Sequence, residues 1–268
     1  PKYIAQKCDI YNYVCVHDTF YKHDVTHVVH LAAETHVDNS ISNPDAFLKS
    51  NVIGTHNLLK AALKFKIKRF HHVSTDEVYG HLEKGDKKFC ENTAYDPRNP
   101  YSASKASSDF LVRAYNNTHD LNTTISNCSN NYGPNQHKEK FIPKIIDALI
   151  NDSLIPVYGK GDNIRDWIYV EDHCSALWKI LTRGKKGETY LVGANCEKTN
   201  LEIIHEICKI FKKNPNDHIS FVNDRLGHDF RYAINSSKIS KELKWKPKTR
   251  LKDGLTKTLK YYEQHFDY

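Results

Sequence analysis

A nearly continuous apolar run from Val25 to Ala33 (VTHVVHLAA) constrains the fold of this chain more than any other segment. Runs of this kind are typical of strands in parallel sheets, which helices cover on both faces. Further apolar strand patterns alternate with helical patterns along the chain. This alternation predicts an α/β fold with a Rossmann-like, doubly wound parallel sheet.

The expected strands and helices follow one another from end to end. We expect strands at 25–33, 69–75, 123–128, 155–158 and 188–192, and helices at 11–23, 43–65, 100–116, 141–149, 171–181, 201–211 and 254–263. Helix 100–116 is expected to turn Phe110, Leu111 and Ala114 toward the core. Segment 81–97 is predicted to be a loop, because it carries too many charges to lie in a core.

Polar residues follow several of the expected strands. Thr35, Thr75–Glu77 and Asn127–Asn131 each come at or after a strand's carboxyl end. Ligands of open α/β sheets bind beyond these ends. We therefore expect these three segments to converge on one site.

Tyr101 and Lys105 follow Asn99-Pro100, a typical helix start. Side chains four residues apart share one face of a helix, so the two tips can meet. A phenol titrates near pH ~10, and a neighbouring ammonium favours its anion. Lowering that pKa by roughly three units corresponds to about 4 kcal/mol. With Thr75 as a hydroxyl donor, the pair predicts a tyrosine base that oxidises an alcohol.

Asp76 and Glu77 add two adjacent carboxyl groups. Neighbouring acids in one site can have different pKa values, so that one remains protonated and the other ionised. An acid and a base together are what the elimination of water requires. Structural explanations compete with this interpretation, since Tyr-x-x-x-Lys occurs by chance in many helices and an Asp-Glu pair in a turn often only caps it.

Composition excludes several classes of protein. No apolar run approaches the ~20 residues of a membrane helix. The net charge of +7 comes from dispersed lysines and arginines, which favours attraction of an anionic diphosphate over nucleic-acid binding. The 16 histidines show no metal-ligand spacing, so no metal site is predicted. Seven cysteines without C-x-x-C predict reduced thiols in a cytoplasmic protein.

A resemblance to a known family rests on several motifs in order. These are HLAAETHVD, STDEVYG, YSASK, NCSNNYGP, GKGDNIRDW with YVEDH, GETY and DRLGHD. The chain resembles the nucleotide-diphosphate-glucose 4,6-dehydratases of the extended short-chain dehydrogenase/reductase group, most closely those that act on dTDP-glucose in rhamnose biosynthesis. The resemblance covers essentially the whole chain.

The resemblance implies a lyase that uses NAD. Tyr101, helped by Lys105 and Thr75, would take the O4 proton of the sugar while a hydride leaves C4. Glu77 would then remove the C5 proton, and Asp76 would protonate the departing C6 hydroxyl. Return of the hydride to C6 gives a 4-keto-6-deoxy sugar.

The resemblance also implies binding residues. Contacts to NAD would come from Asp9, Ile10, Leu31, Ala32, Ala33, Thr35, Ser50, Tyr101, Lys105 and Asn131. Contacts to the sugar nucleotide would come from Thr35, Asn130, Lys140, Phe141, Tyr158, Arg165, Asn200, Arg225 and His228. A guanidinium group can bind two phosphate oxygens at once, in a bidentate contact, which suits Arg165 and Arg225 to a diphosphate. Both arginines could instead form ion pairs with nearby aspartates.

Residues 1–130 are therefore expected to form an NAD-binding domain, to which 165–192 returns, and 131–268 a nucleotide-sugar lobe. The family's first strand and its glycine-rich pyrophosphate turn are expected to precede Pro1, so that the first βαβ unit is missing from this sequence. Helices 44–65 and 100–117 would form the four-helix bundle of a homodimer.

Other functions remain open at this stage. A UDP-glucose 4,6-dehydratase, or another nucleotide-sugar epimerase or decarboxylase, would share the Tyr/Lys pair. The acids of Thr75-Asp76-Glu77 favour dehydration over these. A catalytically inactive sugar-nucleotide-binding protein is the alternative of a different class.

Overall fold

The computed structural model describes residues 3–224 and 227–265, which fall into two units. The first unit comprises 1–80, 91–127 and 177–190, and the second comprises 81–90, 128–176 and 191–268. Both units contain residues that were expected from the sequence to bind the cofactor or the sugar nucleotide. Each unit is described separately below.

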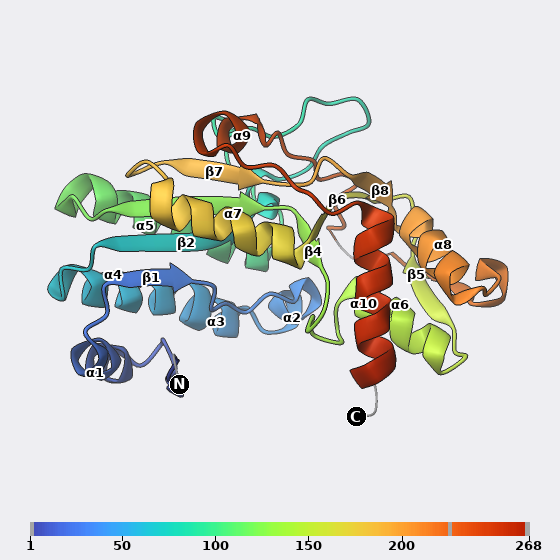
Figure 1. Cartoon of the computed structure of the whole chain (residues 1–268), viewed down its shortest axis with the longest axis horizontal. Coiled ribbons are helices and arrows are strands. Elements are labelled where there is room, and N and C mark those ends of the chain that lie inside the picture. The colour runs from blue at the N-terminus through green and yellow to red at the C-terminus, as the bar shows by residue number, and fades with distance from the viewer. Residues whose placement is uncertain (1–2, 225–226, 266–268) are drawn as a thin grey trace. The chain divides into compact units, whose positions relative to one another are not determined.

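The first unit is built on a sheet with strand order β1-β2-β3-β7 (Figure 1). Its strands are β1 (His27–His30), β2 (Arg69–Thr75), β3 (Thr123–Cys128) and β7 (Thr189–Val192). β1 and β2 are parallel, with Val28 opposite Phe70. The Rossmann-like α/β class predicted from the sequence is confirmed.

Helices connect these parallel strands. α1 (Tyr13–His23), α2 (Val37–Ser42), α3 (Pro44–Phe47), α4 (Gly54–Lys64) and α5 (Pro100–His119) belong to the first unit. α1 packs on α4, and α4 packs on α5. The apolar core between these elements contains Val16, Phe20, Leu58, Leu59, Ala61, Ala62, Ile67, Phe70, Val112, Leu121 and Ile125.

α5 begins where the sequence predicted but buries a different face. Pro100 occupies its first turn, and Asn99 and Ser102 cap it reciprocally. The expectation that Phe110 and Ala114 face the core is wrong, because both are exposed. The buried face is mostly polar, and its residues are Tyr101, Ser102, Ser104, Lys105, Ala106, Ser108, Asp109 and Val112. A buried polar face needs internal partners, and the site described below supplies them.

Two other predicted elements differ in detail. The helix expected at 43–65 is divided into α3, a π-helical segment (Leu48–Ile53) and α4. β1 is shorter than predicted and partly exposed, since it is the edge strand of the sheet described here. A wider π turn often accompanies a functional site.

The second unit contains two small sheets. β4 (Asn130–Tyr132) pairs in parallel with β6 (Ile164–Tyr169), and β6 pairs antiparallel with β8 (Glu197–Thr199). β5 (Ile155–Tyr158) runs parallel to β9 (Ile219–Val222). The helices are α6 (Phe141–Ile150), α7 (Val170–Arg183), which continues into the first unit, α8 (Asn200–Phe211), α9 (Ser237–Leu243) and α10 (Leu251–His265).

The core of the second unit lies around α6 and α8. Its buried residues are Tyr132, Ile142, Ile145, Ile146, Ala148, Leu149, Ile155, Val157, Trp167, Tyr169, Ile203, Ile204, Ile207, Cys208, Leu255, Leu259 and Tyr262. Segment 81–90 also contributes buried residues, contrary to the prediction that 81–97 is too charged for a core. Leu82 and Phe89 are buried and form single bridges with Arg231 and Ile234. Two apolar side chains among many charges were enough to anchor this segment.

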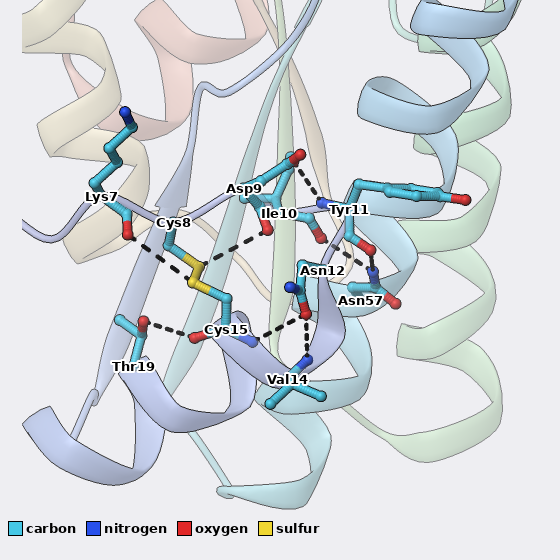
Figure 2. The surroundings of a disulfide bond; sticks show 10 residues. All are labelled: Lys7, Cys8, Asp9, Ile10, Tyr11, Asn12, Val14, Cys15, Thr19 and Asn57. Atoms are coloured by element: carbon cyan, nitrogen blue, oxygen red, sulfur yellow. Dashed lines mark hydrogen bonds between the residues drawn. A yellow bond between two sulfur atoms is a disulfide. The ribbon is translucent and has the colours of Figure 1, made fainter.

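Cys8 and Cys15 form a disulfide that closes the turn before α1 (Figure 2). The expectation that all seven cysteines are reduced is therefore wrong for this pair, whereas the other five are free. Asn12 caps α1 within the closed turn by accepting from the backbone N–H groups of Val14 and Cys15. Across the described residues, no helix combines the length and apolar character needed to span a bilayer.

Candidate functional site

Three of the proposed catalytic residues lie where β2 ends. Thr75 is the last residue of β2, and Asp76 and Glu77 begin the 3₁₀ turn Asp76–Tyr79. The Thr75 hydroxyl caps this turn by accepting from the Glu77 backbone N–H at 3.3 Å. Asp76 is buried, whereas Glu77 is half-buried. The two adjacent carboxyl groups therefore have unequal environments, as a division into acid and base requires.

The other two proposed catalytic residues lie on the first turns of α5, which packs against both β2 and the 3₁₀ turn. Tyr101 and Lys105 are buried, at 7% and 4% exposure. The Lys105 ammonium donates to the Val73 carbonyl at 2.8 Å and so ties the helix to the strand. The structure therefore brings all five residues to one part of the first unit.

A cluster of four polar side chains, three of them buried, lies next to these residues, and it was not predicted from the sequence. It contains His72, Tyr95, Asp109 and Asn127. Burial, followed by the charge of Lys105, lowers the pKa of His72 to about 4, so its imidazole is neutral at pH 7. In the sequence, only the position of Asp109 four residues after Lys105 indicated that its side chain lies on the same helix face as the proposed catalytic pair.

The expected NAD-binding residues of the first unit lie around the carboxyl end of β1 and near α4. Leu31 is 58% exposed, and Ala32 and Thr35 are also exposed. Ser50 is half-buried in the π-helical segment, and Asn131 belongs to the second unit.

Asp9 and Ile10 are held by α4. Asn57 donates to the carbonyls of Ile10 and Tyr11 at 3.0 and 2.8 Å (Figure 2). A Cβ at Gly54 would lie 2.6 Å from Ile10 Cδ1, so a larger residue would require the Ile10 side chain to move. The exposed Asp9 carboxylate accepts from the Tyr11 backbone N–H at 3.0 Å, and a carboxylate is suited to ribose hydroxyls.

The expected sugar-nucleotide residues lie in the second unit, apart from Thr35. Asn130 is in β4, Lys140 immediately precedes α6, and Asn200 is the first residue of α8. Phe141 stacks on Trp167 with ring centroids 6.0 Å apart, and Tyr158 meets His228 edge-on at 6.3 Å. Arg225 lies outside the described residues.

Arg165 is buried and held by neutral partners. Its guanidinium donates to the main-chain carbonyls of Ile164, Asp229 and Phe230 at 2.8, 2.9 and 3.1 Å. Its charge also lies over the Tyr232 ring, 4.4 Å from the centroid. Carbonyls orient a guanidinium without cancelling its charge, so Arg165 is suited to an anionic ligand.

Comparison with known proteins identifies the family. The family model described as GDP-mannose 4,6 dehydratase matches residues 1–258. The chain belongs to this family. A dTDP-glucose 4,6-dehydratase of Shigella flexneri is 46% identical over 97% of this chain and 79% of its own length. One from Mycolicibacterium smegmatis is 52% identical over 88% of this chain and 71% of its own length.

Solved structures of the family agree in fold. A dTDP-glucose 4,6-dehydratase of Streptomyces venezuelae with NAD and TYD bound has a TM-score of 0.92 at 38% identity, covering 96% of this chain and 78% of its own. One from Bacillus anthracis in complex with NAD has a TM-score of 0.91 at 41% identity, covering 100% of this chain and 82% of its own. The similarity therefore extends across both units.

Proposed function

We propose that this protein is an NAD-dependent dTDP-glucose 4,6-dehydratase, a hydro-lyase. The observation that carries the proposal is the grouping of a tyrosine, its lysine and two unlike carboxyl groups around the end of β2. Bound NAD would accept a hydride from one sugar carbon and return it to another. Curated relatives and NAD-bound structures of the same activity support this assignment.

Within this proposal, the chain's own residues move the protons. The Tyr101 phenolate takes the proton from O4 of the sugar, and the Lys105 ammonium stabilises that phenolate. The Thr75 hydroxyl donates to O4. Once C4 is a ketone, the C5 proton is acidic, so Glu77 removes it while buried Asp76 protonates the leaving O6. Water departs and leaves a 4-keto sugar with a C5–C6 double bond. The 4-keto-6-deoxy product would form when the hydride held by the cofactor returns to C6 and Glu77 returns its proton to C5.

The binding residues form part of the same proposal. Asp9, Ile10, Leu31, Ala32, Ala33, Thr35, Ser50, Tyr101, Lys105 and Asn131 would hold NAD. Thr35, Asn130, Lys140, Phe141, Tyr158, Arg165, Asn200, Arg225 and His228 would hold the sugar nucleotide. Arg165 supports this, since three main-chain carbonyls among the described residues orient its guanidinium.

A homodimer in the cytoplasm is also proposed. Phe110 on α5 is 54% exposed, and Leu48 and Ile53 in the π-helical segment are 52% and 43% exposed. Such side chains on neighbouring helices suit burial against a second copy of the chain.

The test is turnover of dTDP-glucose by the full-length enzyme with NAD, followed by mass spectrometry. We expect a product lighter by one water. Glu77→Gln should retain binding of the sugar nucleotide but lose dehydration by about 10²-fold or more, the usual contribution of a general base. Glu263→Gln, at an exposed position on α10, is the matched control and should retain activity.

Three outcomes would contradict parts of the proposal. Full activity in Glu77→Gln would refute the role of that carboxylate. Faster turnover of UDP-glucose than of dTDP-glucose would reassign the substrate. Unchanged sugar nucleotide recovered from a folded, NAD-loaded wild-type protein would favour a binding protein without catalysis.

A further inference from the structure

Segment 229–232 has no role in the proposed reaction, yet it lies against Arg165. Its backbone pairs with the start of β6: the Ile164 N–H donates to the Phe230 carbonyl at 2.7 Å, and the Tyr232 N–H donates to the Ile164 carbonyl at 3.1 Å. Arg165 is the next residue of β6. Both segments belong to the second unit, so the contacts described below lie within one unit.

The Arg165 guanidinium is held at one end and on one face. Its Nη1 atom donates to the Phe230 carbonyl at 3.1 Å, and Nη2 donates to the Asp229 carbonyl at 2.9 Å. The face of the guanidinium lies over the Tyr232 ring, with Cζ 4.4 Å from the ring centroid. None of these contacts uses Nε, and a guanidinium can bind two phosphate oxygens along one edge.

Tyr232 is in turn held by Asp229. The Tyr232 hydroxyl donates to Asp229 Oδ2, and both residues are buried. Asp229 therefore contacts the arginine site twice: its carboxyl group holds the tyrosine ring, and its main-chain carbonyl accepts from the guanidinium on that ring. Asp229, Tyr232 and Arg165 form a closed triangle of contacts.

Asn163 connects this triangle to the start of α8. Its amide donates to the Asp229 carbonyl at 3.3 Å, and its own carbonyl accepts from the Asn200 N–H at 3.1 Å. His228 is the chain neighbour of Asp229. Asp229 is thus linked to three residues expected to bind the sugar nucleotide, which are Arg165, Asn200 and His228.

A histidine supports the main chain of the same segment. The Phe230 N–H donates to His81 Nδ1 at 3.0 Å, and His81 Nε2 lies 2.8 Å from Glu83 Oε1. These contacts assign the imidazole proton to Nε2. Since Nδ1 lies 3.6 Å from Asp229 Oδ1, too far for a hydrogen bond, His81 orients the backbone of the segment.

We propose that Asp229 and Tyr232 are positioning residues for the sugar nucleotide: they hold the Arg165 guanidinium in the orientation that receives the diphosphate. The inference rests on the proposed function for the identity of that ligand. A side chain that is oriented in advance loses less conformational freedom when the ligand binds. Loss of the ring leaves the charge of Arg165 in place but less well oriented, so affinity should fall while the chemical steps continue.

The first experiment measures the Kd for dTDP by calorimetry in the full-length, NAD-loaded enzyme. Tyr232→Leu removes the ring and the hydroxyl, and we expect Kd to rise about tenfold or more. Tyr232→Phe keeps the ring, so we expect a smaller rise, about two- to fourfold. With dTDP-glucose, KM should rise by similar factors and kcat should change less than about twofold, because the diphosphate does not react.

A double-mutant cycle shows whether the effect passes through Arg165. Arg165→Gln replaces the guanidinium by a neutral amide and is combined with Tyr232→Leu. We expect Tyr232→Leu to change the Kd for dTDP by less than about twofold in the Arg165→Gln background. An additive effect, with the same rise in both backgrounds, would overturn the inference.

The role of Asp229 is tested by two side-chain substitutions that leave its main-chain carbonyl in place. Asp229→Asn keeps an oxygen that can accept from the Tyr232 hydroxyl, so Kd should stay within about twofold of the wild type. Asp229→Leu removes the acceptor and should match Tyr232→Phe, which deletes the same hydrogen bond and serves in its place if Asp229→Leu does not fold. A wild-type Kd in folded Asp229→Leu and Tyr232→Phe would overturn the role of this bond.

Tyr262→Leu is the matched control, since it removes another buried tyrosine of the same unit, on α10. It should lower stability and leave the Kd for dTDP unchanged; the same rise as in Tyr232→Leu would overturn the inference. If Arg165→Gln does not fold, thymidine replaces the cycle, because it lacks the diphosphate. Tyr232→Leu should then weaken dTDP but not thymidine, and an equal loss for both would overturn the inference.

Failure of the proposed function is distinguishable from failure of this inference. A wild-type protein that binds dTDP but leaves dTDP-glucose unchanged would refute the dehydratase, and the Kd values would still test Tyr232 and Asp229. An active wild type with an additive cycle would overturn the positioning role and keep the function. A wild type that binds no dTDP would overturn the positioning role, since Arg165 would have no diphosphate to receive.

Discussion

At the scale of single residues, Thr75 has two tasks that one substitution can separate. Its hydroxyl caps the 3₁₀ turn through the Glu77 N–H, and in the proposed reaction it donates to O4 of the sugar. A capping hydroxyl is worth about 1 kcal/mol of stability, whereas a donor to a developing negative charge affects the rate. The free energy of unfolding therefore reports on the capping role of the Thr75 hydroxyl, and the turnover rate reports on its role as a donor to the sugar.

We expect Thr75→Val to lower the free energy of unfolding by about 1 kcal/mol and kcat by about 10–100-fold. Thr75→Ser restores the hydroxyl and should recover most of both. The measurements are urea unfolding and steady-state turnover of dTDP-glucose. A Val variant with wild-type kcat would remove Thr75 from the reaction and leave only its capping role.

The residues of the site differ in how far the sequence could predict them. Thr75 follows a recognisable strand, and Tyr101 follows a recognisable helix start, so local pattern alone places them. Asp109 and Asn127 are a different case. Their contact spans α5 and β3, and only the folded chain makes it.

At the scale of elements, α5 shows why a helix of the right extent was assigned the wrong face. An amphipathic pattern predicts burial of the apolar side, but here a polar side is buried because Tyr101, Lys105 and Asp109 find partners inside the unit. Phe110 is left exposed. Tertiary hydrogen bonding outweighed the sequence pattern.

The exposed side of α5 carries a prediction about assembly. If Phe110 is buried between two copies, Phe110→Asp places a charge in an apolar interface and should convert the dimer to a monomer. Light scattering coupled to gel filtration measures the mass. Phe221→Asp changes an equally exposed phenylalanine on β9 and should leave the dimer intact.

A monomeric wild-type protein would contradict the homodimer. If both variants remain dimeric, the interface lies elsewhere on the chain. Loss of the dimer in both would indicate a general effect of the added charge and would not locate the interface on α5.

At the scale of the whole molecule, buried neutral histidines make stability depend on pH. Burial and the charge of Lys105 lower the pKa of His72 to about 4, and burial alone lowers that of His173 to about 4. Among the described residues, His173 Nε2 has no hydrogen-bond partner. Both units therefore contain an imidazole that resists protonation while folded.

The unfolded chain binds these protons near pH 6.5, so it holds more protons than the folded chain between about pH 6.5 and 4. Stability is full above this range and is lost as the pH falls through it. Each shift corresponds to at most about 3 kcal/mol. We expect urea unfolding at pH 4.5 to give a clearly smaller free energy than at pH 7.

His173→Phe tests this because it keeps an aromatic ring in the buried position and removes the titration. We expect its loss of stability between pH 7 and 4.5 to be smaller than that of the wild type by about 2 kcal/mol, since pH 4.5 lies just above the folded pKa. His205→Phe, at an exposed position on α8, should keep the wild-type dependence. An unchanged dependence in His173→Phe would mean that this imidazole is not the group whose protonation accompanies unfolding.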